Sequence, residues 1–231
     1  MPKKMPKKMP KSRYVLYLNL WGTTAKHLTA EDEGLVFDPA RLAECQTHFR
    51  EILEGNAPTE KTLYAIDYAL LFSDSAAELA QTAQMLFQKI CERNGAFVFW
   101  PLRAAIASDQ NGSSFAGHAS VLAGLLEKSG QKGFRLFASE EVGRELSDRA
   151  GENFRLRPIA TRGLQHFELN WMTPDFLQTS VAGSSFRHHY NDAIARLFEV
   201  DGNYYQQMAG SLADLMRWTE LTSTPQAAEK K

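Results

Sequence analysis

The chain has few cysteines, almost no net charge and no long apolar run, and each absence excludes a class of protein. Its two cysteines, Cys45 and Cys91, provide neither a disulfide framework nor a metal-binding set of thiolates. A net charge of -1 creates no overall field that attracts nucleic acid or an anionic membrane. The apolar run at residues 14–20 is too short to span a bilayer, and no apolar signal segment follows the basic start. We therefore expect a cytoplasmic protein with no nucleic-acid or membrane partner.

Two tails and two patterned regions account for the whole chain. Residues 1–13 are purely basic and contain three prolines, which forbid a continuous helix, so we predict a disordered tail there. Residues 14–172 are predicted to form the main domain. Residues 184–221 have helical periodicity, and we predict a hairpin of two helices that packs on the core or forms a dimer contact. Residues 222–231 are predicted to be disordered.

Strand-like and helix-like segments alternate through the main domain. The pattern predicts strands at 14–20, 62–72, 96–108 and 134–138, helices at 38–54, 75–93, 114–128 and from 139, and a hairpin of residues 154–160 and 163–171. The segment 62–72 fits either a short hairpin interrupted at Asp67 or one strand that ends at Ser73-Asp74. This order indicates an α/β fold, an α+β sandwich with helices against a mixed sheet, of the ferredoxin-like type elaborated at its end.

Several local patterns occur in the order found in one enzyme family. Residues 14–24 are similar to an opening strand and glycine turn, residues 117–127 to a later helix, residues 137–142 to a strand-helix junction, and residues 162–169 to a closing hairpin. Together they resemble the class III nucleotidyl (adenylate/guanylate) cyclase catalytic domain, along roughly residues 14–171. Residues 101–107 are similar to a strand of the bacterial branch that includes the Pycsar-type uridylate cyclases. The resemblance implies the class III cyclase fold and a homodimer.

The resemblance also implies a chemistry against which this chain can be compared. In the family a ribose 3′-hydroxyl attacks the α-phosphate of a nucleoside triphosphate, and two Mg²⁺ or Mn²⁺ ions held by two aspartates assist the reaction. The first aspartate position is Asn19 here, and a neutral amide lacks the anion that two cations share. The helix positions that carry an asparagine and an arginine in many members are Val121 and Leu125 here, which cannot hydrogen-bond to ribose or phosphate.

The second metal-binding aspartate has two candidates. Asp67 matches if residues 62–66 and 68–72 are the arms of a hairpin, and we favour this alternative. Asp74 matches a pattern of the bacterial branch, but it also fits the N-cap of the helix that follows. Asn19, Gly22, Thr23 and Arg103 are the candidate nucleotide-binding residues, because the glycine turn can offer backbone N–H groups to phosphate and Arg103 lies in the matching strand.

These observations predict a cyclase-fold protein that is catalytically impaired and acts through dimerisation and through nucleotide or protein binding. Two alternatives remain open. The first is an active bacterial cyclase that makes a cyclic nucleotide with Mg²⁺ or Mn²⁺ and uses Asp67 or Asp74. The second is a structural interaction module whose functional surface is the helical region at 184–221.

Overall fold

The computed structural model describes ten segments of the chain: residues 13–20, 39–56, 62–64, 68–92, 102–108, 117–129, 134–149, 154–161, 163–179 and 202–223. Among these residues no helix has both the length and the apolar character that crossing a membrane requires.

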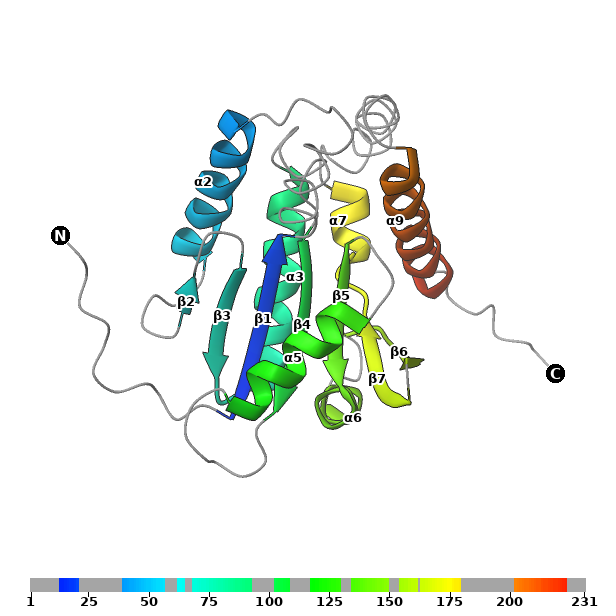
Figure 1. The fold of residues 1–231 in the computed structure, drawn as a ribbon. Helices are drawn as coiled ribbons and strands as arrows, with labels where there is room; N and C mark the ends of the chain where they lie inside the picture. The colour runs from blue at the N-terminus through cyan, green and yellow to red at the C-terminus, as the bar shows by residue number, and fades with distance from the viewer. Residues whose placement is uncertain are drawn as a thin grey trace.

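The described strands form one seven-stranded mixed sheet (Figure 1). In sheet order they are β2 (Thr62–Tyr64), β3 (Tyr68–Ser73), β1 (Tyr14–Leu20), β4 (Leu102–Ser108), β5 (Arg135–Ser139), β7 (Leu164–Leu169) and β6 (Leu156–Thr161). Strands β4 and β5 are parallel, and every other neighbouring pair is antiparallel. The prediction of an α+β fold with a mixed sheet is confirmed.

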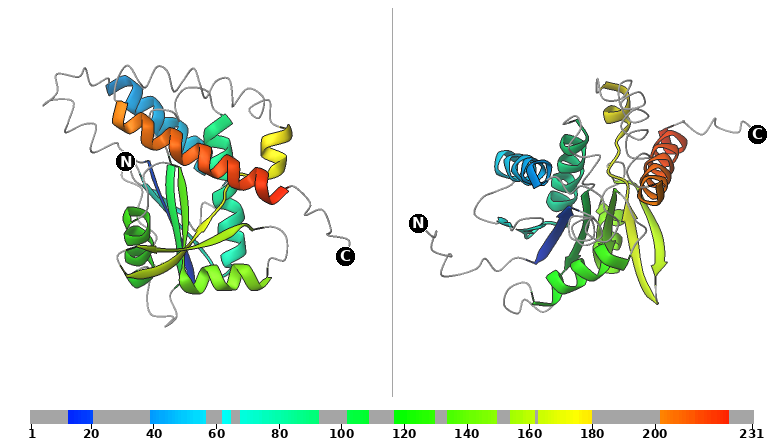
Figure 2. Two further views of the ribbon diagram at one scale, coloured as in Figure 1. Left: turned by 90° about the vertical axis from the view of Figure 1, so that its right-hand side faces the viewer. Right: turned by 45° about the horizontal axis from the view of Figure 1, so that its top comes forward.

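Helices cover both faces of this sheet (Figure 2). The described helices are α2 (Pro39–Asn56), α3 (Ala76–Glu92), α5 (Gly117–Ser129), α6 (Glu140–Arg149), α7 (Pro174–Thr179) and α9 (Gly202–Ser223). Helix α5 covers one face, which we call the α5 face. Helices α3 and α6 cover the other, the α3 face, and α2 packs on α3.

Strand side chains alternate between the two faces, and each face has its own apolar core. On β1, Leu16 and Leu18 belong to the larger core on the α3 face, together with Phe87 and Trp171. Val15 belongs to the smaller core, which includes the α5 residues Ala119, Ala123 and Leu126. Whether the number of a β1 residue is odd or even therefore decides which face of the sheet its side chain lines.

The two hairpins follow from local sequence. Thr62–Tyr64 pairs with Ala69–Leu71, so the hairpin alternative for residues 62–72 is confirmed. Between β6 and β7, Gly163 has a φ of 81°, a left-handed conformation that favours glycine. This is the turn that the sequence predicts between residues 160 and 163.

The C-terminal helix packs on the sheet domain. Leu212 and Leu215 of α9 are buried in the larger core, and α9 crosses the end of the sheet at which β1 ends (Figure 2). The predicted break at residues 201–203 is too long, because α9 begins at Gly202 and already includes Asn203. The first helix of the predicted hairpin lies outside the described residues, as do residues 1–12 and 224–231 of the two predicted tails.

Candidate functional site

Asn19 lies near the end of β1, in a row of polar side chains that crosses four strands. Its partners are Tyr68 on β3 and Arg103 on β4, and Arg103 is in turn paired with Arg135 on β5. Cross-strand partners share a face, with Cβ atoms about 5 Å apart. Because Asn19 has the parity of Val15, the row lies on the α5 face. We call these four residues, Tyr68, Asn19, Arg103 and Arg135, the polar row.

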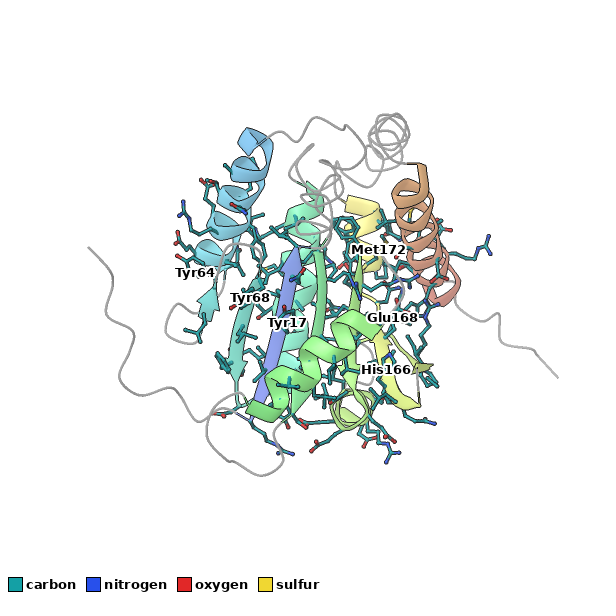
Figure 3. The ribbon with its side chains drawn as sticks, viewed as in Figure 1. Tyr17, Tyr64, Tyr68, His166, Glu168 and Met172 are labelled. Carbon is teal, nitrogen blue, oxygen red and sulfur yellow. The ribbon has the colours of Figure 1, made fainter. Side chains whose placement is uncertain are left out.

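Two tyrosines flank Asn19. The rings of Tyr17 and Tyr68 are stacked, with centroids 5.9 Å apart and planes 9° from parallel, and Figure 3 shows both on the same part of the sheet. Asn19 donates a hydrogen bond from Nδ2 to the hydroxyl oxygen of Tyr17 at 3.4 Å. The amide is thus held against an aromatic pair, and Tyr68 keeps 39% of its surface exposed.

The other half of the polar row is positively charged. Arg103 and Arg135 are both buried and directly opposite each other on parallel strands. Like charges placed opposite each other are destabilising unless counter-ions are near. Arg135 has two such carboxylates, Glu168 on β7 and Asp214 on α9, the latter with Arg135 Nη1 at 3.0 Å from its Oδ2.

These contacts belong to a cluster that ties α9 to the sheet, which we call the arginine–carboxylate cluster: Arg135, Arg157, Glu168 and Asp214. Arg157 Nε donates to Glu168 Oε2 at 2.7 Å, and the Arg157 guanidinium lies 4.6 Å from the ring centre of Trp218. The hydrogen bond from Arg157 holds the pKa of Asp214 below its ordinary value, against the smaller effect of burial. Burial lowers the pKa of Arg157, but hydrogen bonds with Asp214 and Glu168 outweigh it and raise that pKa. Both shifts favour the charged forms of Asp214 and Arg157 at neutral pH.

The structure does not bring Asp74 to Asn19. Ser73, the last residue of β3, is paired with Tyr14, whereas Asn19 is paired with Tyr68 at the other end of the strand. Five residues of strand separate the two ends, about 17 Å. Asp74 is exposed, and its Oδ1 accepts a hydrogen bond from the backbone N–H of Arg13 at 3.2 Å.

The N-cap interpretation of Asp74 is wrong by one residue. Helix α3 begins at Ala76, and Ser75 Oγ accepts a hydrogen bond from the backbone N–H of Glu78 at 3.3 Å. That is the N-cap contact to the third helical residue. Serine and aspartate are both good N-caps, so their order in the sequence alone does not identify which one forms the cap.

The remaining candidates divide into two groups. Asp67, Gly22 and Thr23 lie outside the described residues; the residue after Asp67 is Tyr68, the partner of Asn19. Val121 and Leu125 are described, one turn apart on α5, and they are 60% and 52% exposed. Neither side chain reaches into the domain, so both apolar groups face outward from the helix.

The described residues of this site do not fit a pair of divalent cations. Mg²⁺ and Mn²⁺ need anionic oxygen ligands, and Asn19 offers one neutral carbonyl oxygen. Its neighbour on β4, Arg103, is a buried cation that repels a metal ion. In the described segments, no three His, Cys, Asp or Glu side chains are grouped so that they could hold a metal ion. The same amide, hydroxyl and guanidinium groups are hydrogen-bond donors that suit an anion.

The arginine–carboxylate cluster was not predicted from the sequence. Arg135 and Glu168 are 33 residues apart, and Asp214 is 79 residues from Arg135. One signal was present in the sequence. Three charged residues lie inside predicted strands, at positions that line the same face of the sheet: Arg135, Arg157 and Glu168. Charges in that position need partners on neighbouring strands.

Comparisons with known proteins give a likeness in structure alone. The chain is similar to the adenylyl cyclase CyaB from P. aeruginosa (15% identity, 68% of this chain and 92% of that chain, TM-score 0.46). It is also similar to the catalytic core of a rhodopsin-guanylyl cyclase with converted specificity in complex with ATPalphaS (13% identity, 68% and 94%, TM-score 0.48). A third similar structure is an adenylate/guanylate cyclase/hydrolase from Silicibacter pomeroyi (15% identity, 68% and 93%, TM-score 0.42). No protein-family model matches the sequence, and no curated protein matches it.

Proposed function

We propose that the chain is a class III cyclase-like protein that binds a nucleotide without cyclising it and acts as a homodimer. The observation that carries the proposal is the position of Asn19. Asn19 stands at the position that resembles the family's first metal-binding aspartate, and its cross-strand neighbour is the buried cation Arg103.

The electrostatics of the polar row support binding over catalysis. Two divalent cations bring four positive charges to a site whose described residues already include the buried guanidinium of Arg103; the charge of Arg135 beside it is balanced by Glu168 and Asp214. Cyclisation needs those cations to activate the 3′-hydroxyl and to neutralise the leaving pyrophosphate. Binding of a nucleotide without turnover does not need those cations, because hydrogen-bond donors and positive charge are sufficient to bind a phosphate.

Purified protein incubated with each ribonucleoside triphosphate and Mn²⁺ should yield no cyclic nucleotide. Calorimetric titration should still show that at least one nucleotide binds. Asn19→Asp should increase the affinity for Mn²⁺, because it restores a carboxylate beside the phosphate site. Asn56→Asp is the matched control: Asn56 is also half-buried, but it lies at the end of α2 and should leave Mn²⁺ binding unchanged.

A cyclic product from the wild-type protein that disappears in Asp67→Ala would contradict the proposal and support an active cyclase. Absence of binding to any nucleotide, with no turnover, would instead support an interaction module.

Self-association is the second part of the proposal, and the outer surface of α5 supports it. Val121 and Leu125 form an exposed apolar pair, one helical turn apart, in a helix whose opposite side is buried on the sheet. The same positions correspond to polar residues in the family, so their apolar character serves contact rather than catalysis. A second copy of the chain that packs on this pair would remove it from water.

The double variant Val121→Lys/Leu125→Lys should convert a dimer to a monomer in sedimentation-velocity experiments. The charged side chains cannot be buried in the contact without a large desolvation penalty. Ala43→Lys, at an exposed position of α2, is the control and should remain dimeric. If the wild-type protein were monomeric at a concentration of about tens of micromolar, the proposed homodimer would be contradicted.

A further inference from the structure

We propose that the protein binds a water molecule inside the domain, between Ser139 on β5 and His166 on β7, with hydrogen bonds to Ser139 Oγ and His166 Nε2. The inference does not depend on the proposed function. Two observations carry it: the strand register places these residues opposite each other, and each has a buried polar atom with no hydrogen-bond partner in the part of the chain that the structure describes.

The register of β5 and β7 brings the two side chains together. Ser139 and His166 are cross-strand partners in this antiparallel pair, and His166 is labelled in Figure 3. Both line the α5 face, because Ser139 is two residues from Phe137 of the smaller core and the His166 ring meets the Phe137 ring edge-on, at a centroid distance of 5.6 Å. Cβ atoms of such partners are about 5 Å apart. The two polar atoms form no direct hydrogen bond, and water commonly joins groups that are this close but not bonded.

The backbone of Leu164 decides which ring nitrogen of His166 carries the proton. His166 Nδ1 is 3.2 Å from the carbonyl oxygen of Leu164. A carbonyl oxygen only accepts hydrogen bonds, so Nδ1 is the donor, and in the neutral imidazole Nε2 is then an acceptor. The residue is 1% exposed, and Nε2 has no partner among the described residues. This nitrogen therefore needs a donor from outside the described side chains and backbone.

The nearest side chains on this face do not supply that donor. Ile159, the partner of His166 on β6, is apolar, and so is Phe137 on β5. Glu168 lies two residues along β7 on the same face, but its two carboxylate oxygens accept hydrogen bonds from the arginines of the arginine–carboxylate cluster. Ser139 is thus the polar neighbour that the register offers to His166.

The hydroxyl of Ser139 is in the same situation as the imidazole. Ser139 is 6% exposed and directly precedes α6, where a serine hydroxyl ordinarily accepts a hydrogen bond from a backbone N–H of the first turn. Ser75 makes that contact at the start of α3. Ser139 Oγ makes no such contact within the described segments, so its hydrogen-bonding capacity is left for a different group.

Water is the ligand that suits this pair of atoms. It can donate one hydrogen bond to His166 Nε2 and form a second one with Ser139 Oγ, which both donates and accepts. Buried waters in proteins make about three hydrogen bonds, to polar groups that have no other partner. Because both residues are almost completely buried, the ligand is one small enough to be enclosed as the chain folds.

A crystal structure at atomic resolution tests the site directly and should show a water molecule within hydrogen-bond distance of Ser139 Oγ and His166 Nε2. Nitrogen-15 NMR of the His166 ring should place the proton on Nδ1. Ser139→Ala should lower the midpoint of thermal unfolding by about 2 °C or more, because the water and the imidazole lose a partner. Ser147→Ala is the control: Ser147 is exposed on α6, so its replacement by a better helix former should not lower the midpoint.

Three results would count against the proposal. A direct hydrogen bond between Ser139 Oγ and His166 Nε2 in the crystal, without a water in contact with either, would overturn it. A proton on Nε2 would overturn the acceptor role assigned to that nitrogen. If Ser139→Ala left the midpoint unchanged or raised it, the hydroxyl would have no bound partner, since removal of an unsatisfied buried polar group is neutral or stabilising.

Discussion

Replacing Arg135 by methionine should lower the free energy of unfolding by about 3 to 5 kcal/mol, the usual loss when one partner of a buried ion pair is removed. Arg135 and Glu168 are both buried and form an ion pair. Methionine fills much of the arginine volume but leaves the Glu168 carboxylate with only Arg157, whose side chain is partly exposed. Urea denaturation followed by circular dichroism measures the change, as a lower midpoint at unchanged slope.

The matched control is Arg144→Met. Arg144 and Glu140 form an ion pair one turn apart on α6, and both are exposed. Exposed pairs of this kind contribute about 0.3 to 0.5 kcal/mol. The double variant Arg135→Met/Glu168→Leu should recover a large part of the loss, because it removes the buried charge along with its partner. If Arg135→Met were as mild as Arg144→Met, the cluster would not stabilise the fold in the way that its burial indicates.

Gly143→Ala should destabilise the protein by about 1 to 3 kcal/mol, the typical effect of overpacking a core. Gly143 lies in α6, and a Cβ atom there would stand 2.1 Å from Cδ2 of Phe167 on β7 and 2.9 Å from its Cβ. The contact includes the base of the phenylalanine side chain, so rotation of the ring does not relieve it. Thermal unfolding measures the change as a lower midpoint.

Gly124→Ala tests the same substitution without the clash. Gly124 lies in α5, and no atom is within 4 Å of a Cβ built there. Alanine is the better helix former, so this variant should gain up to about 1 kcal/mol of stability. Phe167→Ala should reduce the additional loss caused by Gly143→Ala, since it removes Cγ and Cδ2, the two nearest atoms. Equal effects of the two glycine substitutions would mean that α6 can move away from β7.

The elements of this fold could be predicted because their signals are local. Apolar residues occupy both alternating sets of positions on β1, with Val15 in one set and Leu16 and Leu18 in the other, which predicts a strand buried on both faces. The apolar spacing of residues 75–93 predicts α3. The turn at Gly163 was predictable for the same reason, because its conformation favours one residue type. The N-cap residue of α3 could not be predicted in this way. Asp74 and Ser75 are adjacent and chemically similar, and only the backbone geometry decides between them.

The sequence could predict which residues to consider for the site, but it could not predict how they are arranged in space. Asn19 and Arg103 were singled out by their resemblance to family positions, 84 residues apart in the chain. That they are direct partners depends on the β1–β4 register, which long-range pairing sets. The stacking of Tyr17 on Tyr68 has the same origin, and the separation of Asp74 from Asn19 follows from the β1–β3 register.

The class of fold, the order of the strands and helices along the chain, and a neutral amide at position 19 near the end of the first strand could all be found in the sequence alone. These features depend on residue type and on short-range periodicity, which are visible in any stretch of a few turns or strand residues. The surroundings of Asn19 depend on the folded chain: a tyrosine pair lies on one side of it and a buried arginine on the other, and the cluster that holds α9 lies beyond that arginine. The physical reason is that a charge or a ring acts through its nearest neighbours, and strand register selects those neighbours from distant parts of the chain.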